Sequence, residues 1–283
     1  MRLDKFLADM GVGSRSDLKK AIRKSLVTVN GAVEKDPGAQ VSAEDHICFD
    51  GAEIRYAEQQ YYMLHKPAGV LSASEDRRQT TVVDLINLND ELVRKDLFPV
   101  GRLDKDTEGL LIITNDGPLA HQLLVPKHHI DKTYYAIVTG TITEDDQRAF
   151  TRGIRYDEKL TALPATLRVL STGKTVADLR SELGFNATSE RLLRTRLAGP
   201  AFIGAEEPAD IMEDSLVSEV EITIQEGKFH QIKKMVKALP GGKEILYLRR
   251  ISMGALRLDP DLAPGEFRKL SEDEIRILKD ATN

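Results

Sequence analysis

Apolar and polar residues alternate along much of this chain in short runs typical of strands, and a few stretches show the period of a helix. Beyond residue 60 the pattern predicts strands at 61–66, 69–72, 97–100, 110–114, 134–139, 165–170 and 217–224. It predicts helices at 81–86, 118–124, 144–151, 230–238 and 272–280, the last with a capping box of Ser271 and Glu274. Strands at hairpin spacing with few helices between them favour an α+β fold with a largely antiparallel mixed sheet and peripheral helices.

The first 56 residues have an organisation of their own. They predict two short helices, at 2–10 and 14–24, followed by strand-like pieces with turns at Asn30-Gly31 and Asp50-Gly51. Residues 55–60 are polar and lack apolar periodicity, which is typical of a linker. We therefore expect a small domain at 1–56 and a larger one at 57–283.

Composition narrows the class of protein. The chain has 283 residues, 41% hydrophobic and 30% charged, which describes a soluble protein with ample core. Its single cysteine, Cys48, excludes a disulfide scaffold and a cysteine-rich zinc site. Because no apolar run reaches membrane-spanning length and the first residues lack a secretory signal, we expect a cytoplasmic protein that binds no membrane.

A formal net charge of -5 argues weakly against a nucleic-acid partner, but two segments are basic. In residues 2–24 seven basic residues face three acidic ones, giving +4, and these seven are Arg2, Lys5, Arg15, Lys19, Lys20, Arg23 and Lys24. In residues 228–250 seven basic residues stand against one acidic residue, giving +6. The basic residues include Lys228, Lys233, Lys234 and Arg250. Such patches suit an RNA backbone, although on charge alone a solvated helix face explains the first equally well.

Residues 101–109, Gly-Arg-Leu-Asp-Lys-Asp-Thr-Glu-Gly, form a charged loop between two strand-like flanks that we expect to pair, and Asp116-Gly117 afterwards is a hairpin-turn signal. The acids of the loop imitate the start of a calcium site, but position twelve is Asn115 and strands flank the loop, so calcium is not expected. A carboxylate pair for glycoside chemistry and a plain polar loop both remain open. Arg102 would point to the same side as Asp104.

Two further segments carry candidate chemistry. Tyr134 would stack on a base or exchange a proton, although a partly buried strand tyrosine is the commoner case. Residues 226–235 turn from a strand into a basic helix, whose start would attract phosphate or hold a carboxylate ionised. His230 lies in this turn, but a lone histidine is more often structural and we leave it out of the predicted chemistry.

The N-terminal residues carry a resemblance to a known domain. The run Arg2-Leu-Asp-Lys-Phe-Leu7, with Ser14-Arg15, Ile22 and Val27-Thr-Val-Asn-Gly31, resembles the small RNA-binding domain named after ribosomal protein S4. One departure is Ser25, where that family usually has glycine at the helix exit. Because a left-handed serine is strained, we expect the turn to differ there.

The rest of the chain resembles the pseudouridine synthases of the small-subunit ribosomal RNA type, the RsuA family. The resemblance rests on Gly101-Arg-Leu-Asp104 with the following Asp106-Thr107 and Gly109-Leu-Leu111, and on segments 128–134, 226–235, 248–250, Gly254 and 262–268. It implies isomerisation of a uridine in 16S ribosomal RNA, without cofactor or metal, by a protein that we expect to be a monomer. It also implies that Asp104 is the catalytic aspartate, that Arg102 helps the nucleotide leave the stack, that Tyr134 packs against the uracil, and that Ile232 and Lys233 lie beside the aspartate.

Such a reaction breaks the N1 glycosidic bond, turns the uracil and rejoins it through C5. The sequence does not choose between attack of Asp104 on the ribose, attack on the uracil ring, and deprotonation of the sugar. A relative acting on 23S RNA and a non-catalytic RNA-binding assembly factor remain as alternatives. The substrate is either free small-subunit RNA or an assembly intermediate. The chain departs from the family at about 171–218, an insertion of net charge -3 with breaks at Gly199-Pro200 and Glu207-Pro208, for which we expect a peripheral role.

Overall fold

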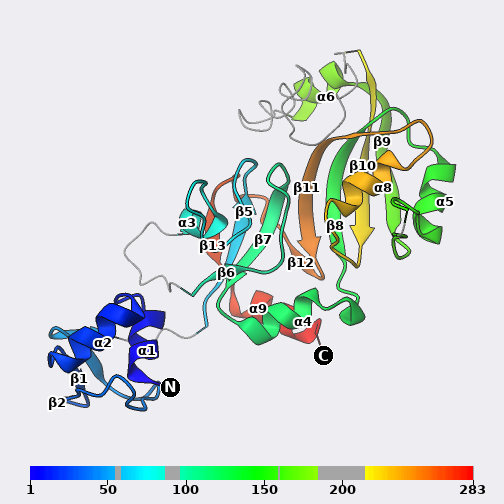
Figure 1. Cartoon of the computed structure of the whole chain (residues 1–283). Helices are drawn as coiled ribbons and strands as arrows, with labels where there is room; N and C mark the ends of the chain where they lie inside the picture. The colour runs from blue at the N-terminus through cyan, green and yellow to red at the C-terminus, as the bar shows by residue number, and fades with distance from the viewer. Residues whose placement is uncertain (55–58, 87–95, 159, 184–213, 283) are drawn as a thin grey trace.

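The computed structural model describes residues 1–54, 59–86, 96–158, 160–183 and 214–282 (Figure 1). The N-terminal part holds helices α1 (Leu3–Asp9) and α2 (Arg15–Arg23), as predicted. An antiparallel sheet follows in the order β2-β1-β3-β4, formed by β1 (Val27–Val29), β2 (Ala32–Val33), β3 (Ile47–Phe49) and β4 (Ala52–Ile54). Leu3, Phe6, Leu18 and Ile22 pack the helices onto the sheet through a core of their own.

The exit from α2 differs from our expectation. Ser25 adopts the left-handed conformation, with φ +66°, that we expected a serine to avoid. Its N–H donates to Ile22 O at 3.0 Å, and the Leu26 N–H donates to Ala21 O at 3.2 Å. These two bonds satisfy carbonyls at the helix end, which offsets the cost of a left-handed residue with a side chain.

Beyond residue 60 the described residues form a second sheet of nine strands, in the order β13-β5-β7-β11-β8-β10-β9, with β6 on β7 and β12 on β11. The strands are β5 (Tyr61–Lys66), β6 (Phe98–Pro99), β7 (Glu108–Thr114), β8 (Lys132–Thr139), β9 (Thr166–Thr175), β10 (Leu216–Ile224), β11 (Ile245–Met253), β12 (Leu256–Arg257) and β13 (Phe267–Lys269). The pairings between these strands are antiparallel except that of β7 with β11. The predicted α+β class and the largely antiparallel mixed sheet are confirmed.

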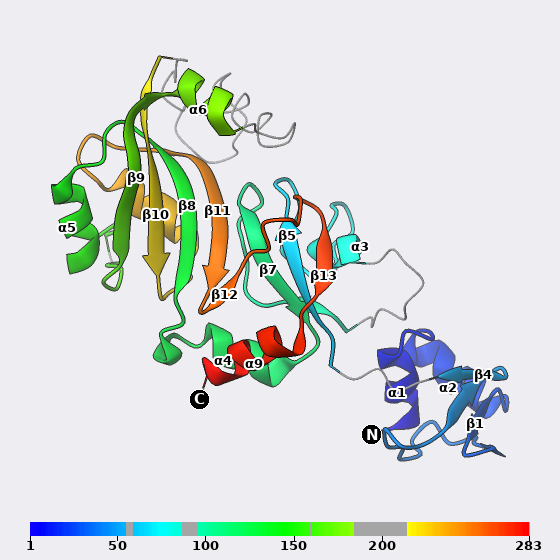
Figure 2. The ribbon, with the colours of Figure 1, turned by 180° about the vertical axis from the view of Figure 1, so that it is seen from behind.

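The helices are peripheral, as predicted: α3 (Val82–Ile86), α4 (Gly117–Leu124), α5 (Glu144–Arg152), α6 (Val176–Leu183), α8 (Gln231–Lys237) and α9 (Glu272–Asp280), with a 3-10 turn at Pro126–His128. Figures 1 and 2 show α8 on one face of the β8–β10–β9 half of the sheet, while α4 and α9 lie beside each other at the other half. Alternation along β5 and β7 sends Leu64 and Leu111 into the core below α8 and Met63 and Ile112 into the core below α4 and α9.

Several local predictions were wrong. Residues 69–72 form no strand and contribute only an isolated bridge, Leu71 with Thr81. Asp116-Gly117 starts α4 instead of turning a hairpin, because Asp116 Oδ1 accepts the Leu119 N–H at 3.1 Å and caps the helix. Strand β11 was not predicted as a strand, nor were β12 and β13.

Both ends of the predicted insertion at 171–218 lie in strands. Residues 171–175 continue β9 and 216–218 begin β10, and these two strands pair with each other. Helix α6 follows β9 within the connection between these two strands, and residues 184–213, with both Pro breaks, lie outside the described residues. The linker at 55–58 also lies outside them. Within the described part of the chain, no helix is long and apolar enough to cross a membrane.

Candidate active site

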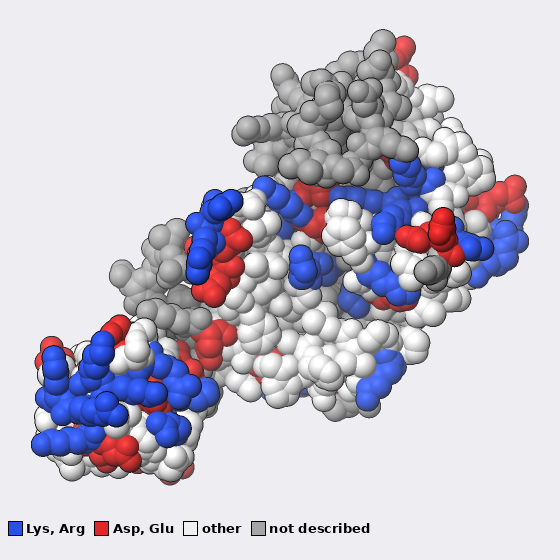
Figure 3. All heavy atoms as spheres, viewed as in Figure 1, with Lys and Arg blue, Asp and Glu red and all other residues white. Residues whose placement is uncertain are grey.

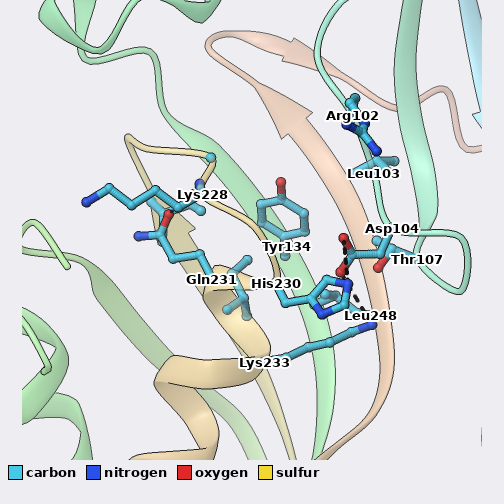
Figure 4. A pocket seen from close by; sticks show the side chains of 13 residues that line it. Arg102, Leu103, Asp104, Thr107, Tyr134, Lys228, His230, Gln231, Lys233 and Leu248 are labelled. Atoms are coloured by element: carbon cyan, nitrogen blue, oxygen red, sulfur yellow. Dashed lines mark hydrogen bonds and ion pairs between the residues drawn. The ribbon is translucent and has the colours of Figure 1, made fainter. Parts of the chain in front are cut away.

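A pocket opens where the 101–109 loop meets strands β8, β10 and β11 and the start of α8 (Figure 4). It is lined by Arg102, Leu103, Asp104, Thr107, Tyr134, Ile224, Gly227, Lys228, His230, Gln231, Ile232, Lys233 and Leu248. Six of these residues were predicted from the sequence: Arg102, Asp104, Tyr134, Lys228, Ile232 and Lys233. The fold thus brings together residues that lie far apart along the chain.

The backbone of the loop is tied down on both sides of Asp104. Ser72 Oγ donates to Leu103 O at 2.8 Å and accepts the Leu103 N–H at 3.1 Å. Beneath the loop, the buried Lys66 Nζ donates to three backbone carbonyls, those of Pro67 at 3.0 Å, Lys105 at 3.2 Å and Thr107 at 3.0 Å. Asp104 is therefore presented on a rigid support.

Lys233, on the first turn of α8, bridges two of the three acids of the loop. Its Nζ lies 3.3 Å from Asp104 Oδ2 and donates to Asp106 Oδ1 at 2.6 Å. His230 Nε2 lies 3.7 Å from Asp104 Oδ1 (Figure 4). The Asp104 side chain keeps 25% of its surface exposed, so it faces the pocket with one cation beside it and room for a substrate.

The remaining wall is aromatic and apolar. Tyr134 of β8 is 7% exposed, and its ring stands between Asp104 and the Lys228–Gln231 turn (Figure 4). Leu103, Ile224 and Leu248 complete this side of the pocket. A narrow cavity with one aromatic face, apolar neighbours and a few polar groups suits a planar heterocycle such as a nucleobase.

Glu226 organises the turn that carries Lys228 and His230. It accepts hydrogen bonds from Lys228 Nζ at 2.6 Å, from Gln231 Nε2 at 2.8 Å and from the Leu163 N–H at 3.0 Å. Burial alone would raise the pKa of Glu226, but these bonds outweigh it and hold that pKa below its usual range. Glu226 thus stays charged and fixes the turn at the pocket rim.

The sequence matches two known families. The sequence pattern of RNA pseudouridylate synthases matches residues 60–238, and that of the S4 domain matches residues 1–47. The chain belongs to the RNA pseudouridylate synthase family. It is 39% identical over 281 residues to the uncharacterized RNA pseudouridine synthase YtzG of Bacillus subtilis, covering 99% of each chain. It is 34% identical to ribosomal small subunit pseudouridine synthase A of Pasteurella multocida, covering 97% of this chain and 98% of the relative.

A solved structure supports the same assignment. The crystal structure of a pseudouridylate synthase superposes with a TM-score of 0.57 at 32% identity, covering 98% of this chain and 99% of the other. The predicted resemblance to the S4 domain and to the RsuA type of synthase is therefore confirmed. In the described part of the synthase no cluster of three or more His, Cys, Asp or Glu residues is arranged to hold a metal ion.

Two predicted site residues of the synthase need comment. Arg250 is 2% exposed, and its Nε donates to Leu110 O at 2.8 Å inside the sheet, so its predicted role in RNA binding is wrong. Successive side chains of a strand point to opposite faces of the sheet, so the position of Arg250 along β11 determines which face its side chain takes. Lys234 does lie at the surface near the pocket, 3.9 Å from Asp157 Oδ2.

The seven cations of the N-terminal basic patch lie on α1 and α2 or beside them, and Figure 3 shows Lys and Arg gathered on this domain. Three of them, Arg2, Arg15 and Lys19, surround the buried carboxylate of Asp4 at 3.1, 3.3 and 3.9 Å. Lys5 pairs with Asp9 and Lys20 with Asp17. The sequence showed these cations, but not that three of them share Asp4 as a partner.

The sequence reasoning missed His230, Thr107 and Gln231 as pocket residues. His230 was set aside because no second group beside it could be seen in the sequence. Its partner Asp104 is distant in the chain, so only the packing of α8 on the sheet reveals the pair.

Proposed function

We propose that this synthase converts a specific uridine of 16S ribosomal RNA to pseudouridine, with Asp104 as the catalytic carboxylate. The observation that carries the proposal is the position of Asp104, beside Lys233 and opposite the Tyr134 ring in one pocket. The choice of 16S RNA is supported by relatives named ribosomal small subunit pseudouridine synthase A, at 31–34% identity over nearly their whole length.

Five of the pocket residues have a role in this proposal. Asp104 attacks the ribose or the uracil, or takes a proton from the sugar, none of which needs an external cofactor. Tyr134 and Ile232 pack against the extruded uracil, and Lys233 balances the charge of Asp104 while the base excludes water. Arg102, exposed at the rim, fills the space that the uridine leaves in the RNA stack.

The rest of the RNA would lie along cationic surfaces. We assign residues 1–56 to an RNA-binding domain and residues 57–283 to the catalytic domain of a monomer. Arg2, Lys5, Arg15, Lys19, Lys20, Arg23 and Lys24 would contact phosphates from the first domain, and Lys228 and Lys234 from the second. Unstacking the target costs a few kcal/mol, which these contacts offset.

Pseudouridine mapping of ribosomal RNA tests the proposal. Cells that lack the gene receive either the wild-type protein or Asp104→Asn, and both proteins are quantified to match their levels. We expect one 16S position to be modified only with the wild-type protein. Identical maps from the two proteins would show that Asp104 is not catalytic. A position that disappears from 23S RNA would refute the substrate, and a map unchanged by loss of the gene would favour a non-catalytic binder.

A further inference from the structure

Phe229 is the most exposed of the large hydrophobic residues in the described part of the chain, at 71%. It lies in the turn from β10 to α8, between Lys228 and His230, both of which line the pocket. The core makes no use of its ring. A single exposed hydrophobic residue is common at protein surfaces, but this phenyl group stands between two residues that line the pocket, where its apolar face can meet bound RNA.

The ring is held in a defined orientation. It stacks on the His230 imidazole, with centroids 3.8 Å apart and planes 21° apart. His230 has φ +51°, a left-handed conformation that non-glycine residues rarely adopt, so the turn is shaped to place both rings. Because Phe229 keeps 71% of its surface exposed, much of its side chain remains open to solvent beyond the His230 contact.

The surroundings of the ring are cationic. Lys234 Nζ lies 5.7 Å from the Phe229 ring centroid, and Lys228, next in the chain, keeps 42% of its side chain exposed. An aromatic platform flanked by lysines is the arrangement by which proteins bind single-stranded nucleic acid, where bases stack on the ring and phosphates meet the cations.

We propose that Phe229 stacks on the base of a nucleotide next to the target uridine and holds the RNA strand open at the pocket rim. The proposal rests on the proposed function in one respect: the extruded uracil occupies the Asp104 pocket. His230 then forms the partition between the two sites, because its imidazole contacts Phe229 on one side and Asp104 on the other. Phe229 is a positioning residue for the RNA, distinct from the groups that touch the reacting uracil.

Fluorescence gives a direct test, because the chain contains no tryptophan. Phe229→Trp in an Asp104→Asn background carries one indole on the platform, and Ile277→Trp, on the exposed face of α9, is the matched control. On titration with a short oligouridylate we expect emission to be quenched at position 229 and unchanged at 277, since a stacked base quenches indole. Equal responses at the two positions would overturn the proposal.

Kinetics on unmodified 16S RNA transcript give the second arm. Phe229→Leu keeps an apolar side chain but removes the flat face, and we expect kcat/KM to fall about tenfold to a hundredfold, the range for one stacked base. Phe229→Tyr restores the face and should recover most of that loss, whereas a general packing role would leave Tyr and Leu alike. If wild-type protein does not modify this protein-free transcript, the mapping in cells decides on the proposed substrate, and the quenching result alone decides on Phe229.

Discussion

Gly109 and Arg250 approach so closely that a methyl group on Gly109 would lie 2.2 Å from the Arg250 carbonyl oxygen. Gly109 has φ +105°, and it stands opposite Arg250 in the parallel pairing of β7 with β11. The Arg250 side chain runs inside the sheet to Leu110 O. Because Asp104 lies five residues before Gly109, this contact sets how the loop meets the β11 side of the pocket.

We therefore expect Gly109→Ala to destabilise the catalytic domain by about 3 kcal/mol or more, through the backbone clash and the strained φ. Urea unfolding would measure the loss. Gly117→Ala is the matched control, since a methyl group there meets nothing within 4 Å and φ is not positive. If both variants unfold at the same urea concentration, the close approach does not constrain the fold.

Lys233 gives a second prediction because it serves two carboxylates at once. In Lys233→Met the side chains of Asp104 and Asp106 lose their shared cation, and their charges repel across the pocket. We expect kcat to fall about tenfold to a hundredfold, as measured by tritium release from uridine-labelled 16S RNA. Adding Asp106→Asn to Lys233→Met removes the repulsion and should recover part of kcat. Additive losses in the double variant would contradict the shared role.

The elements that the sequence predicted well are those with local signals. Strand β5 shows clean boundaries, and α9 begins at a capping box in which Ser271 and Glu274 exchange hydrogen bonds. The 101–109 loop was singled out because its acids lie between two strand-like flanks. In each case the residues that decide the structure are neighbours in the chain.

The predictions that failed depend on contacts between distant residues. Strand β11 was not predicted because Arg249 and Arg250 interrupt its apolar pattern. Only the assembled sheet shows that Arg250 is buried and that its side chain donates a hydrogen bond to Leu110 O. The pair Asp116-Gly117 is compatible both with a hairpin turn and with the start of a helix. Tertiary packing of Leu119 and Leu123 under the sheet favours the helix.

Lys66 couples the loop to pH. Its side chain is fully buried and donates to the Pro67, Lys105 and Thr107 carbonyls, and burial lowers the pKa of Lys66 from 10.5 to about 8. Between about pH 8 and 10.5 the unfolded chain therefore holds a proton on Lys66 that the folded chain has released. Stability rises with pH wherever the unfolded state binds more protons, so burial of the charge costs most below about pH 8.

We accordingly expect wild-type protein to gain stability relative to Lys66→Met as pH rises from about 8 to about 10.5, measured as the difference in free energy of unfolding. Lys132, whose pKa is also lowered to about 8 by burial, is common to both proteins and cancels. At neutral pH, Lys66→Met should lower kcat, because the loop loses three hydrogen bonds, while RNA affinity stays the same. A pH-independent difference in stability would contradict the account.

Asp4 presents an electrostatic paradox in the N-terminal domain. Its carboxylate is fully buried under Arg2, Arg15 and Lys19, and the hydrogen bonds from Arg2 hold the pKa of Asp4 below its usual range. The three cations keep about half of their surface exposed around this anion. A negative charge near an RNA-binding surface should weaken binding through Coulomb repulsion, but this charge also forms ion pairs with three of the cations.

Asp4→Asn distinguishes repulsion of the RNA by Asp4 from orientation of the cations by Asp4, because the two effects change RNA affinity in opposite directions. The change removes one negative charge, so charge alone predicts tighter RNA binding and a steeper dependence of that binding on salt. If Asp4 orients the cations, we expect affinity for 16S RNA to fall about two- to fivefold, the scale of partly exposed ion pairs, with a shallower dependence on salt in filter binding. Asp9→Asn is the control, because it removes the same charge while its pair with Lys5 lies on one helix, and it should bind slightly tighter. Circular dichroism must show both variants folded at the assay temperature. Tighter binding by both variants would mean that Asp4 only lowers the charge of the surface.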